Sequence, residues 1–162
     1  MKDITQTIDR VDILSFLKQQ LGSIRLRSLI AEIDGISLEE QRRFTLDQLG
    51  RILGKSALME LPRNISSNFD GYPRLKRVAR RFWKSVKREV YIFSCPWRVE
   101  YLLARRRVMQ SVDQSEPAIV GLISVSISAR IGIPTTALPA VVACALLMLF
   151  ELGSDAFGDH FT

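Results

Sequence analysis

The chain has 162 residues and a formal net charge of +6 at pH 7. Hydrophobic residues make up 47% of the sequence and charged residues 25%, with 9 glycines and 6 prolines, which excludes collagen-like, low-complexity and wholly disordered proteins. The length predicts one domain, or one small domain with an appendage. Cys95 and Cys144 are far apart and His160 is the single histidine, so the spacing matches neither a zinc site nor a disulfide framework.

The positive charge is concentrated in one part of the chain. Residues 1–73 are charge-balanced, residues 74–107 carry 12 bases and 2 acids, and residues 108–162 have a net charge of −4. Because the excess of bases is local, it indicates a polyanion-binding region rather than a uniformly basic protein.

The N-terminal third predicts a charge-balanced helical interaction module over residues 1–62. Acids stand where a signal peptide would have a basic region, so we expect a cytoplasmic protein. Apolar residues three and four apart predict helices over residues 4–21 and 24–33. A capping box at Ser37 and Glu40 predicts a third helix over residues 38–53, which either continues through Phe44 or breaks there. Pro62 ends the module, and the turn-rich residues 63–72 are interpreted as a linker.

Residues 45–62 also resemble a helix-turn-helix motif. Gly54 would form the turn, and residues 57–61 would form the second helix. That helix is short and carries no Arg, Asn or Gln to read base edges, so a plain helical hairpin is favoured.

Residues 73–112 predict a basic amphipathic two-helix region. Apolar residues recur at helical spacing over residues 75–93, bases occupy the opposite face, and Glu89 is the one acid that interrupts them. A second, shorter helix follows Pro96. Such a surface suits an anionic membrane or a nucleic acid. The bases expected to bind the polyanion are Arg74, Lys76, Arg77, Arg80, Arg81, Lys84, Lys87 and Arg88 on the first helix and Arg105, Arg106 and Arg107 on the second.

Residues 117–152 predict an apolar hairpin or a membrane segment, followed by an acidic tail over residues 153–162. Residues 131–150 are uncharged and just long enough to span a bilayer. However, Pro134 and Pro139 interrupt them, and a buried core hairpin is the alternative. The preceding segment, residues 118–129, is too short to span and could be a half-span, an interfacial element or a strand. Arg130 would lie at the tip of the hairpin, where a charge is a functional candidate.

The sequence contains no recognisable catalytic motif. Cys95, before Pro96 and among bases, is either an activated thiol or a small buried residue, and the second interpretation is favoured. We therefore expect a non-enzymatic protein with no cofactor, no metal and no small-molecule substrate.

These observations predict a mostly α-helical bundle. The expected function is that of an effector or scaffold at the cytoplasmic face of a membrane, which docks on anionic lipid through its basic helix and inserts its apolar C-terminal segment. A protein partner or self-association is expected for the N-terminal module. The alternative is a soluble all-helical nucleic-acid-binding protein with residues 118–150 buried in its core.

Overall fold

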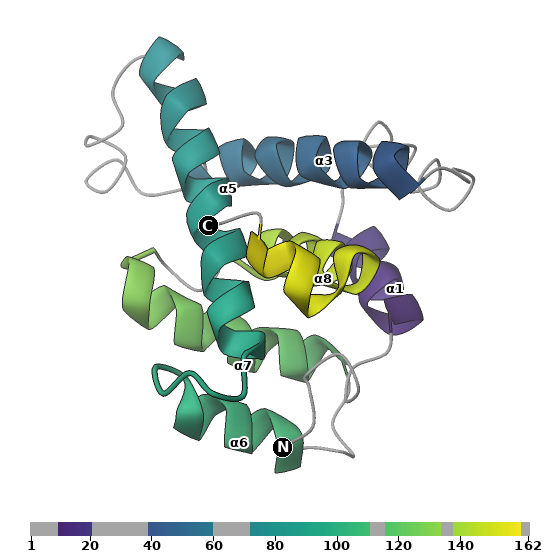
Figure 1. Ribbon diagram of the computed structural model, residues 1–162. Helices are drawn as coiled ribbons and strands as arrows, with labels where there is room; N and C mark the ends of the chain where they lie inside the picture. The colour runs from purple at the N-terminus through teal and green to yellow at the C-terminus, as the bar shows by residue number, and fades with distance from the viewer. Residues whose placement is uncertain (1–9, 21–38, 60–71, 111–115, 134–137, 160–162) are drawn as a thin grey trace.

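A computed structural model of the chain describes residues 10–20, 39–59, 72–110, 116–133 and 138–159. These residues contain six α-helices and no strand (Figure 1), which confirms the expected mostly α-helical fold. The helices are α1 (Arg10–Gln20), α3 (Glu39–Met59), α5 (Tyr72–Ser94), α6 (Leu102–Gln110), α7 (Glu116–Ile131) and α8 (Pro139–Asp159). The helix expected over residues 24–33, residues 63–71 of the expected linker, Pro134 and His160 lie outside the described residues.

α3 is one continuous helix, and this corrects the expectation of a turn at Gly54. A glycine inside a helix costs about 1 kcal/mol relative to alanine, so a reason for its presence is needed. Gly54 lies against α5, where an added Cβ atom would be 3.2 Å from the Phe82 ring. The glycine therefore serves close helix packing, and both the helix-turn-helix and the favoured helical hairpin are wrong for residues 45–59.

α7 is helical over residues 118–129, for which a strand was one of the expected alternatives. The hydroxyl groups of Ser124 and Ser126 donate hydrogen bonds to the carbonyl oxygens of Val120 and Leu122, four residues earlier. These bonds satisfy the polar groups of the serines within the helix, so the segment can pack among apolar neighbours.

α8 is the central helix of the fold. Residues 141–149 are all buried, each with an exposed fraction of 3% or less. α8 contacts α1, α3, α5 and α7, and Figure 1 shows it between α3 and α7. A helix that is apolar on every side requires such complete enclosure. No helix in the described part of the chain combines the length and the apolar character needed to cross a membrane.

The expected acidic tail includes a second helical segment. Gly153 has φ 75° and ψ 160°, a backbone conformation that glycine adopts without strain, and it bends the chain within α8. Beyond the bend, Phe157 is fully buried, with its ring 6.3 Å from that of Tyr91 on α5. Residues from all three expected regions thus contribute to one hydrophobic core.

Candidate polyanion-binding surface

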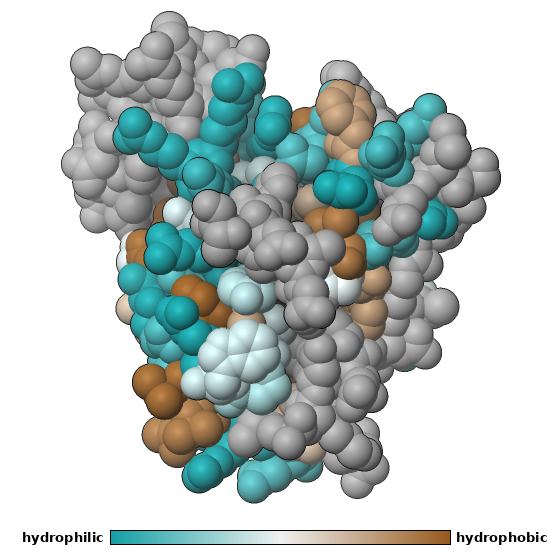
Figure 2. Space-filling model, viewed as in Figure 1, coloured by the Kyte–Doolittle hydropathy of each residue, from teal (hydrophilic) through white to brown (hydrophobic). Residues whose placement is uncertain are grey.

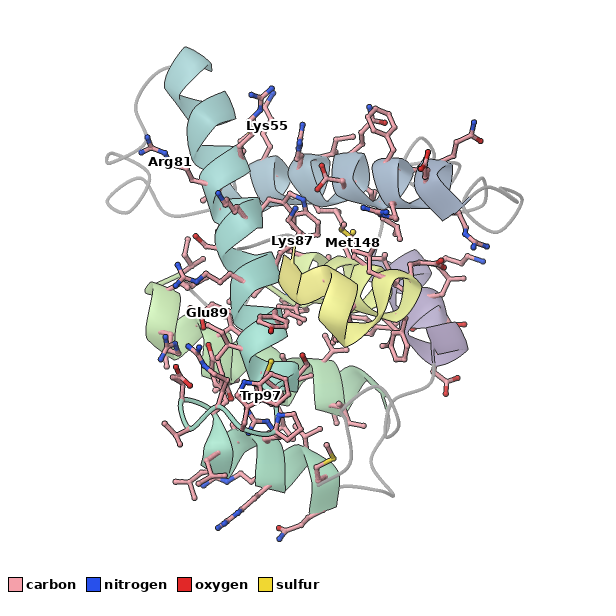
Figure 3. All side chains as sticks on the ribbon, viewed as in Figure 1. Lys55, Arg81, Lys87, Glu89, Trp97 and Met148 are labelled. Atoms are coloured by element: carbon pink, nitrogen blue, oxygen red, sulfur yellow. The ribbon has the colours of Figure 1, made fainter. Side chains whose placement is uncertain are left out.

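α5 separates apolar and basic side chains on opposite sides of one helix. Its apolar side chains, Ala79, Phe82, Trp83, Val86 and Val90, are buried against the core. Four bases on the other side are exposed and are called the α5 basic face: Arg80, Arg81, Lys84 and Arg88. Figure 3 shows Arg81 pointing away from the core. Arg74, Lys76 and Arg77 belong to the same helix, but their side chains lie outside the described part of the structure.

Lys87 must be removed from the expected polyanion-binding residues, because it is 5% exposed. Its Nζ atom donates to Asp47 Oδ1 on α3 at 2.9 Å and lies 5.3 Å from the centre of the Trp83 ring. On a helix, Lys87 is four residues after Trp83 and therefore shares its inward side. Lys87 joins α5 to α3 instead of facing solvent.

Asp47 accepts several bonds at this junction. Trp83 Nε1 donates to its Oδ1 atom at 2.8 Å, and an Arg51 nitrogen lies 2.9 Å from its Oδ2 atom. Burial by itself would raise the pKa of Asp47, but the hydrogen bonds from Trp83 and Lys87 and the nearby positive charges hold that pKa below its usual value. The carboxylate is therefore a charged structural link between α3 and α5.

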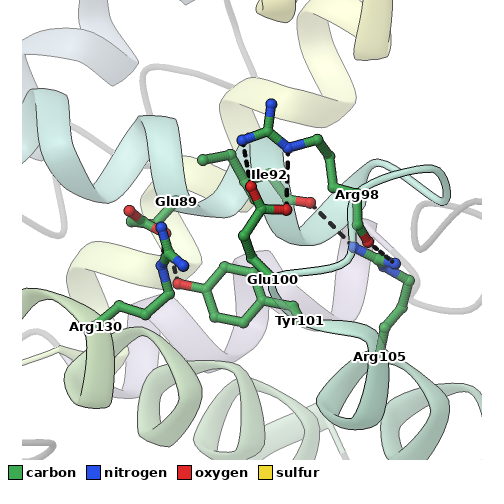
Figure 4. Close-up of polar contacts among 7 residues, drawn as sticks. All are labelled: Glu89, Ile92, Arg98, Glu100, Tyr101, Arg105 and Arg130. Atoms are coloured by element: carbon green, nitrogen blue, oxygen red, sulfur yellow. Dashed lines mark hydrogen bonds and ion pairs between the residues drawn. The ribbon is translucent and has the colours of Figure 1, made fainter.

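Arg105 is the second correction, since its side chain is 1% exposed. It donates hydrogen bonds to four backbone carbonyl oxygens and thereby closes the C-terminal end of α5. The acceptors are the carbonyl groups of Ile92, Phe93, Pro96 and Arg98. Figure 4 shows the bonds to Ile92 and Arg98. A cation is favoured at a helix C-terminus, where the last carbonyl groups lack helical partners. Burial lowers the pKa of Arg105.

Arg106 and Arg107 are exposed on α6. Three successive helical residues point in directions about 100° apart, so Arg105, Arg106 and Arg107 could not all face one ligand. Three consecutive arginines on one helix therefore indicate, from the sequence alone, that at least one of them faces away from a shared ligand.

Arg130 joins α7 to Glu89 on α5 and to Tyr101, the residue that precedes α6. Its Nε atom is 3.0 Å from Glu89 Oε2, and the Tyr101 hydroxyl group donates to the same oxygen at 2.6 Å (Figure 4). The Arg130 guanidinium group also lies 5.4 Å from the centre of the Tyr101 ring. Burial and the hydrogen bond to Glu89 raise the pKa of Tyr101. The only acid of α5 is thus used internally, and the α5 basic face is not neutralised by it.

Three large apolar side chains are exposed where α5 connects to α6: Trp97 and Val99 lie in the connection, and Leu103 lies in the first turn of α6. The helix expected directly after Pro96 begins only at Leu102. Trp97 is 68% exposed, Val99 77% and Leu103 70%, and together they are called the apolar patch. Figure 2 shows hydrophobic side chains over this loop and the start of α6, on the same visible face as the hydrophilic side chains along α5. Trp97 lies beyond the C-terminal end of α5 (Figure 3). Arg98, within the patch, forms an ion pair with Glu100.

A groove of about 260 Å³ lies between α3 and α5. Arg51 and Lys55 line it from α3, and Arg80 lines it from α5, with Ile52 and Ala79 as its apolar lining. Lys55 lies beside the crossing of the two helices (Figure 3). Sequence analysis missed this group because Arg51 and Lys55 belong to the charge-balanced third of the chain.

The other chemically reactive residues are structural. Burial raises the pKa of the Cys95 thiol although Arg105 and Arg98 are near, which contradicts an activated thiol. Burial also raises the pKa of Cys144, which lies in the core. Pro139 is the first residue of α8, where its missing N–H group has no helical partner to lose. Within the described ranges, no group of His, Cys, Asp or Glu could hold a metal ion.

Comparison of the chain with protein-family models, curated proteins and solved structures finds no match.

Proposed function

We propose that the protein is a non-enzymatic peripheral membrane protein, which docks on anionic lipid through the α5 basic face and the apolar patch. The observation that carries this proposal is the exposure of Trp97, Val99 and Leu103 at the end of the helix that bears the exposed bases. Exposed apolar side chains grouped beside positive charges are typical of a surface that contacts lipid headgroups and the acyl boundary below them.

The aliphatic members of the apolar patch favour lipid over nucleic acid. A tryptophan can stack on a base, but Val99 and Leu103 have no aromatic face with which to do so. All three side chains gain free energy on leaving water for the membrane interface, where tryptophan is enriched. Nucleic acid remains the competing ligand for the bases alone.

The charges and the apolar side chains both contribute to the expected affinity. A base near an anionic membrane contributes roughly 1 kcal/mol, so the four bases of the α5 basic face contribute about 4 kcal/mol. This corresponds to about a thousandfold in the partition constant. Burying one large apolar side chain adds roughly 1.5–3 kcal/mol when the burial is complete.

The proposal keeps α8 in the protein core. Moving residues 141–149 into a bilayer would expose the apolar sides of α1, α3, α5 and α7, which now pack against them. Insertion of the C-terminal segment, which the sequence led us to expect, is therefore not part of the proposed function.

Sedimentation with phosphatidylcholine vesicles, prepared with and without phosphatidylserine, tests the proposal. We expect binding that requires phosphatidylserine and weakens with salt. Arg80→Gln/Arg81→Gln/Lys84→Gln/Arg88→Gln should weaken it by about a thousandfold. Replacing the three arginines by lysine instead should preserve most of the binding, because the charge is retained.

The apolar patch is tested separately. Trp97→Ser/Val99→Ser should weaken vesicle binding by about tenfold or more, whereas Phe44→Ser, at a side chain 64% exposed on α3, should not. Equal binding to neutral and anionic vesicles, or no binding to either, would overturn the proposal. Salt-sensitive retention on duplex DNA together with no vesicle binding would assign the α5 basic face to nucleic acid.

A further inference from the structure

The groove between α3 and α5 results from two glycines that let the helices approach closely. An added Cβ atom at Gly50 would be 2.2 Å from a Trp83 ring carbon, and one at Gly54 would be 3.2 Å from Phe82. The two glycines are four residues apart and so lie on one side of α3. Arg51 and Lys55 each follow one of them, and the close crossing therefore brings both bases to the edge where α5 presents Arg80.

The described residues that line the groove are either basic or apolar. Of the described residues that line it, three are bases and none is acidic. Arg51 shares the charge of Asp47 with the buried Lys87, so this one carboxylate is divided between two cations. Arg80 belongs to the exposed bases of α5, and Arg51 is half-exposed, so an incoming anion can reach both.

We propose that this groove is a binding site for a phosphomonoester group. Two arginines offer planar pairs of N–H donors that match phosphate oxygens, and Lys55 adds a compact charge. A volume of about 260 Å³ is slightly below that of sites for drug-sized ligands. It suits a phosphate group with a small part of the molecule that carries it, held between the apolar Ile52 and Ala79.

The phosphate could belong to a membrane lipid headgroup or to a free sugar phosphate, since both present the same dianion. The lipid source rests on the proposed membrane function, because the groove shares Arg80 with the α5 basic face. The soluble source does not depend on it. A test with both probes therefore separates the two proposals.

The first measurement is calorimetric titration of the full chain with inositol trisphosphate. Lys55→Gln/Arg80→Gln should weaken binding by at least about tenfold, the effect of losing one charge-assisted hydrogen bond. Arg81→Gln/Arg88→Gln also removes two positive charges, but from positions on α5 outside the groove. It should weaken binding of inositol trisphosphate by no more than about threefold, because only long-range electrostatic attraction is lost. Lys55→Arg/Arg80→Lys should restore most of the affinity. Thermal unfolding of each variant checks that the fold is retained.

The second measurement compares vesicles containing phosphatidylinositol bisphosphate with vesicles of equal surface charge made with phosphatidylserine. Preference for the phosphoinositide, lost in Lys55→Gln/Arg80→Gln but kept in Arg81→Gln/Arg88→Gln, would assign the lipid source. Binding of inositol trisphosphate in the calorimetric titration, together with no binding to either kind of vesicle, would support the phosphate site and reject the membrane function. The phosphate site would be overturned if both double variants lost the same affinity for each probe. It would also be overturned if the wild-type protein bound neither probe.

Discussion

At the scale of single residues, Asp47 joins α3 to α5 through its side-chain carboxylate. It lies on α3 and accepts hydrogen bonds from Trp83 and Lys87 of α5, while it also pairs with Arg51. Without this carboxylate, the buried Lys87 would lose the ion pair that its Nζ atom makes with Asp47 Oδ1 at 2.9 Å. Loss of one partner of a buried ion pair is strongly destabilising.

We expect Asp47→Asn to lower the free energy of unfolding by about 2 to 3 kcal/mol at neutral pH. The folded protein holds the pKa of Asp47 below its usual value. The stabilisation by this group is therefore fully present above the unfolded-state pKa, about 3.9, and is lost as the pH falls through the lower folded-state pKa. Urea unfolding at a series of pH values should show the difference between wild type and variant shrinking below about pH 4.

Glu40→Gln serves as the control, because Glu40 is an exposed acid on the same helix. It should change stability by less than about 0.5 kcal/mol. An equal effect of the two substitutions at neutral pH would show that Asp47 does not link the helices. Restoration of stability in the double variant Asp47→Asn/Lys87→Met would confirm that loss of the Asp47–Lys87 ion pair is the cause.

At the scale of helices, the crossing of α3 and α5 depends on the missing side chain at Gly50. We expect Gly50→Ala to destabilise the protein by about 1–3 kcal/mol, because its Cβ atom would overlap the Trp83 ring. The higher helix propensity of alanine, worth about 1 kcal/mol, acts in the opposite direction. Chemical denaturation measures the balance of the two effects.

Gly121→Ala is the matched control within α7. Apart from its chain neighbours and the backbone of its own helix, no atom lies within 4 Å of the position that its Cβ would occupy, so the substitution should stabilise the protein by up to about 1 kcal/mol. The changes in the free energy of unfolding caused by the two alanine substitutions should therefore have opposite signs. Stabilisation by both would mean that α3 and α5 do not pack closely at Gly50.

At the scale of the whole molecule, α8 is shared by the regions that the sequence suggested as separate parts. It packs against helices from the N-terminal module and the basic region as well as against α7. Deletion of residues 117–162 should therefore abolish cooperative thermal unfolding and cause aggregation, as the apolar sides of α1, α3 and α5 become exposed. Circular dichroism and size-exclusion chromatography would detect both changes.

Two point variants test the same core without removing any chain. Val142 is fully buried in α8, so Val142→Asp should unfold the protein or severely destabilise it. Val125, 55% exposed on α7, should tolerate the same change. A truncated chain of residues 1–116 that unfolds cooperatively as a monomer would contradict the shared core.

The sequence by itself determined the elements whose signals are local. The periodicity over residues 75–93 lies within α5, because the spacing of buried and exposed positions is a property of the helix itself. The concentration of bases in residues 74–107 and the apolar character of residues 140–150 are likewise visible without any structure.

Only the tertiary structure decided what surrounds each residue. An apolar helix has the same periodicity in a bilayer and in a protein core, and the packing of α1, α3, α5 and α7 around α8 selects the core. Lys87 and Arg105 have the same charge as their exposed neighbours, and their burial follows from acceptors on other elements: Asp47 for Lys87, and the carbonyl groups of residues 92–98 for Arg105. The groove between α3 and α5 depends on bases that only the glycine-mediated crossing brings together, because no local pattern encodes the contact between two distant segments.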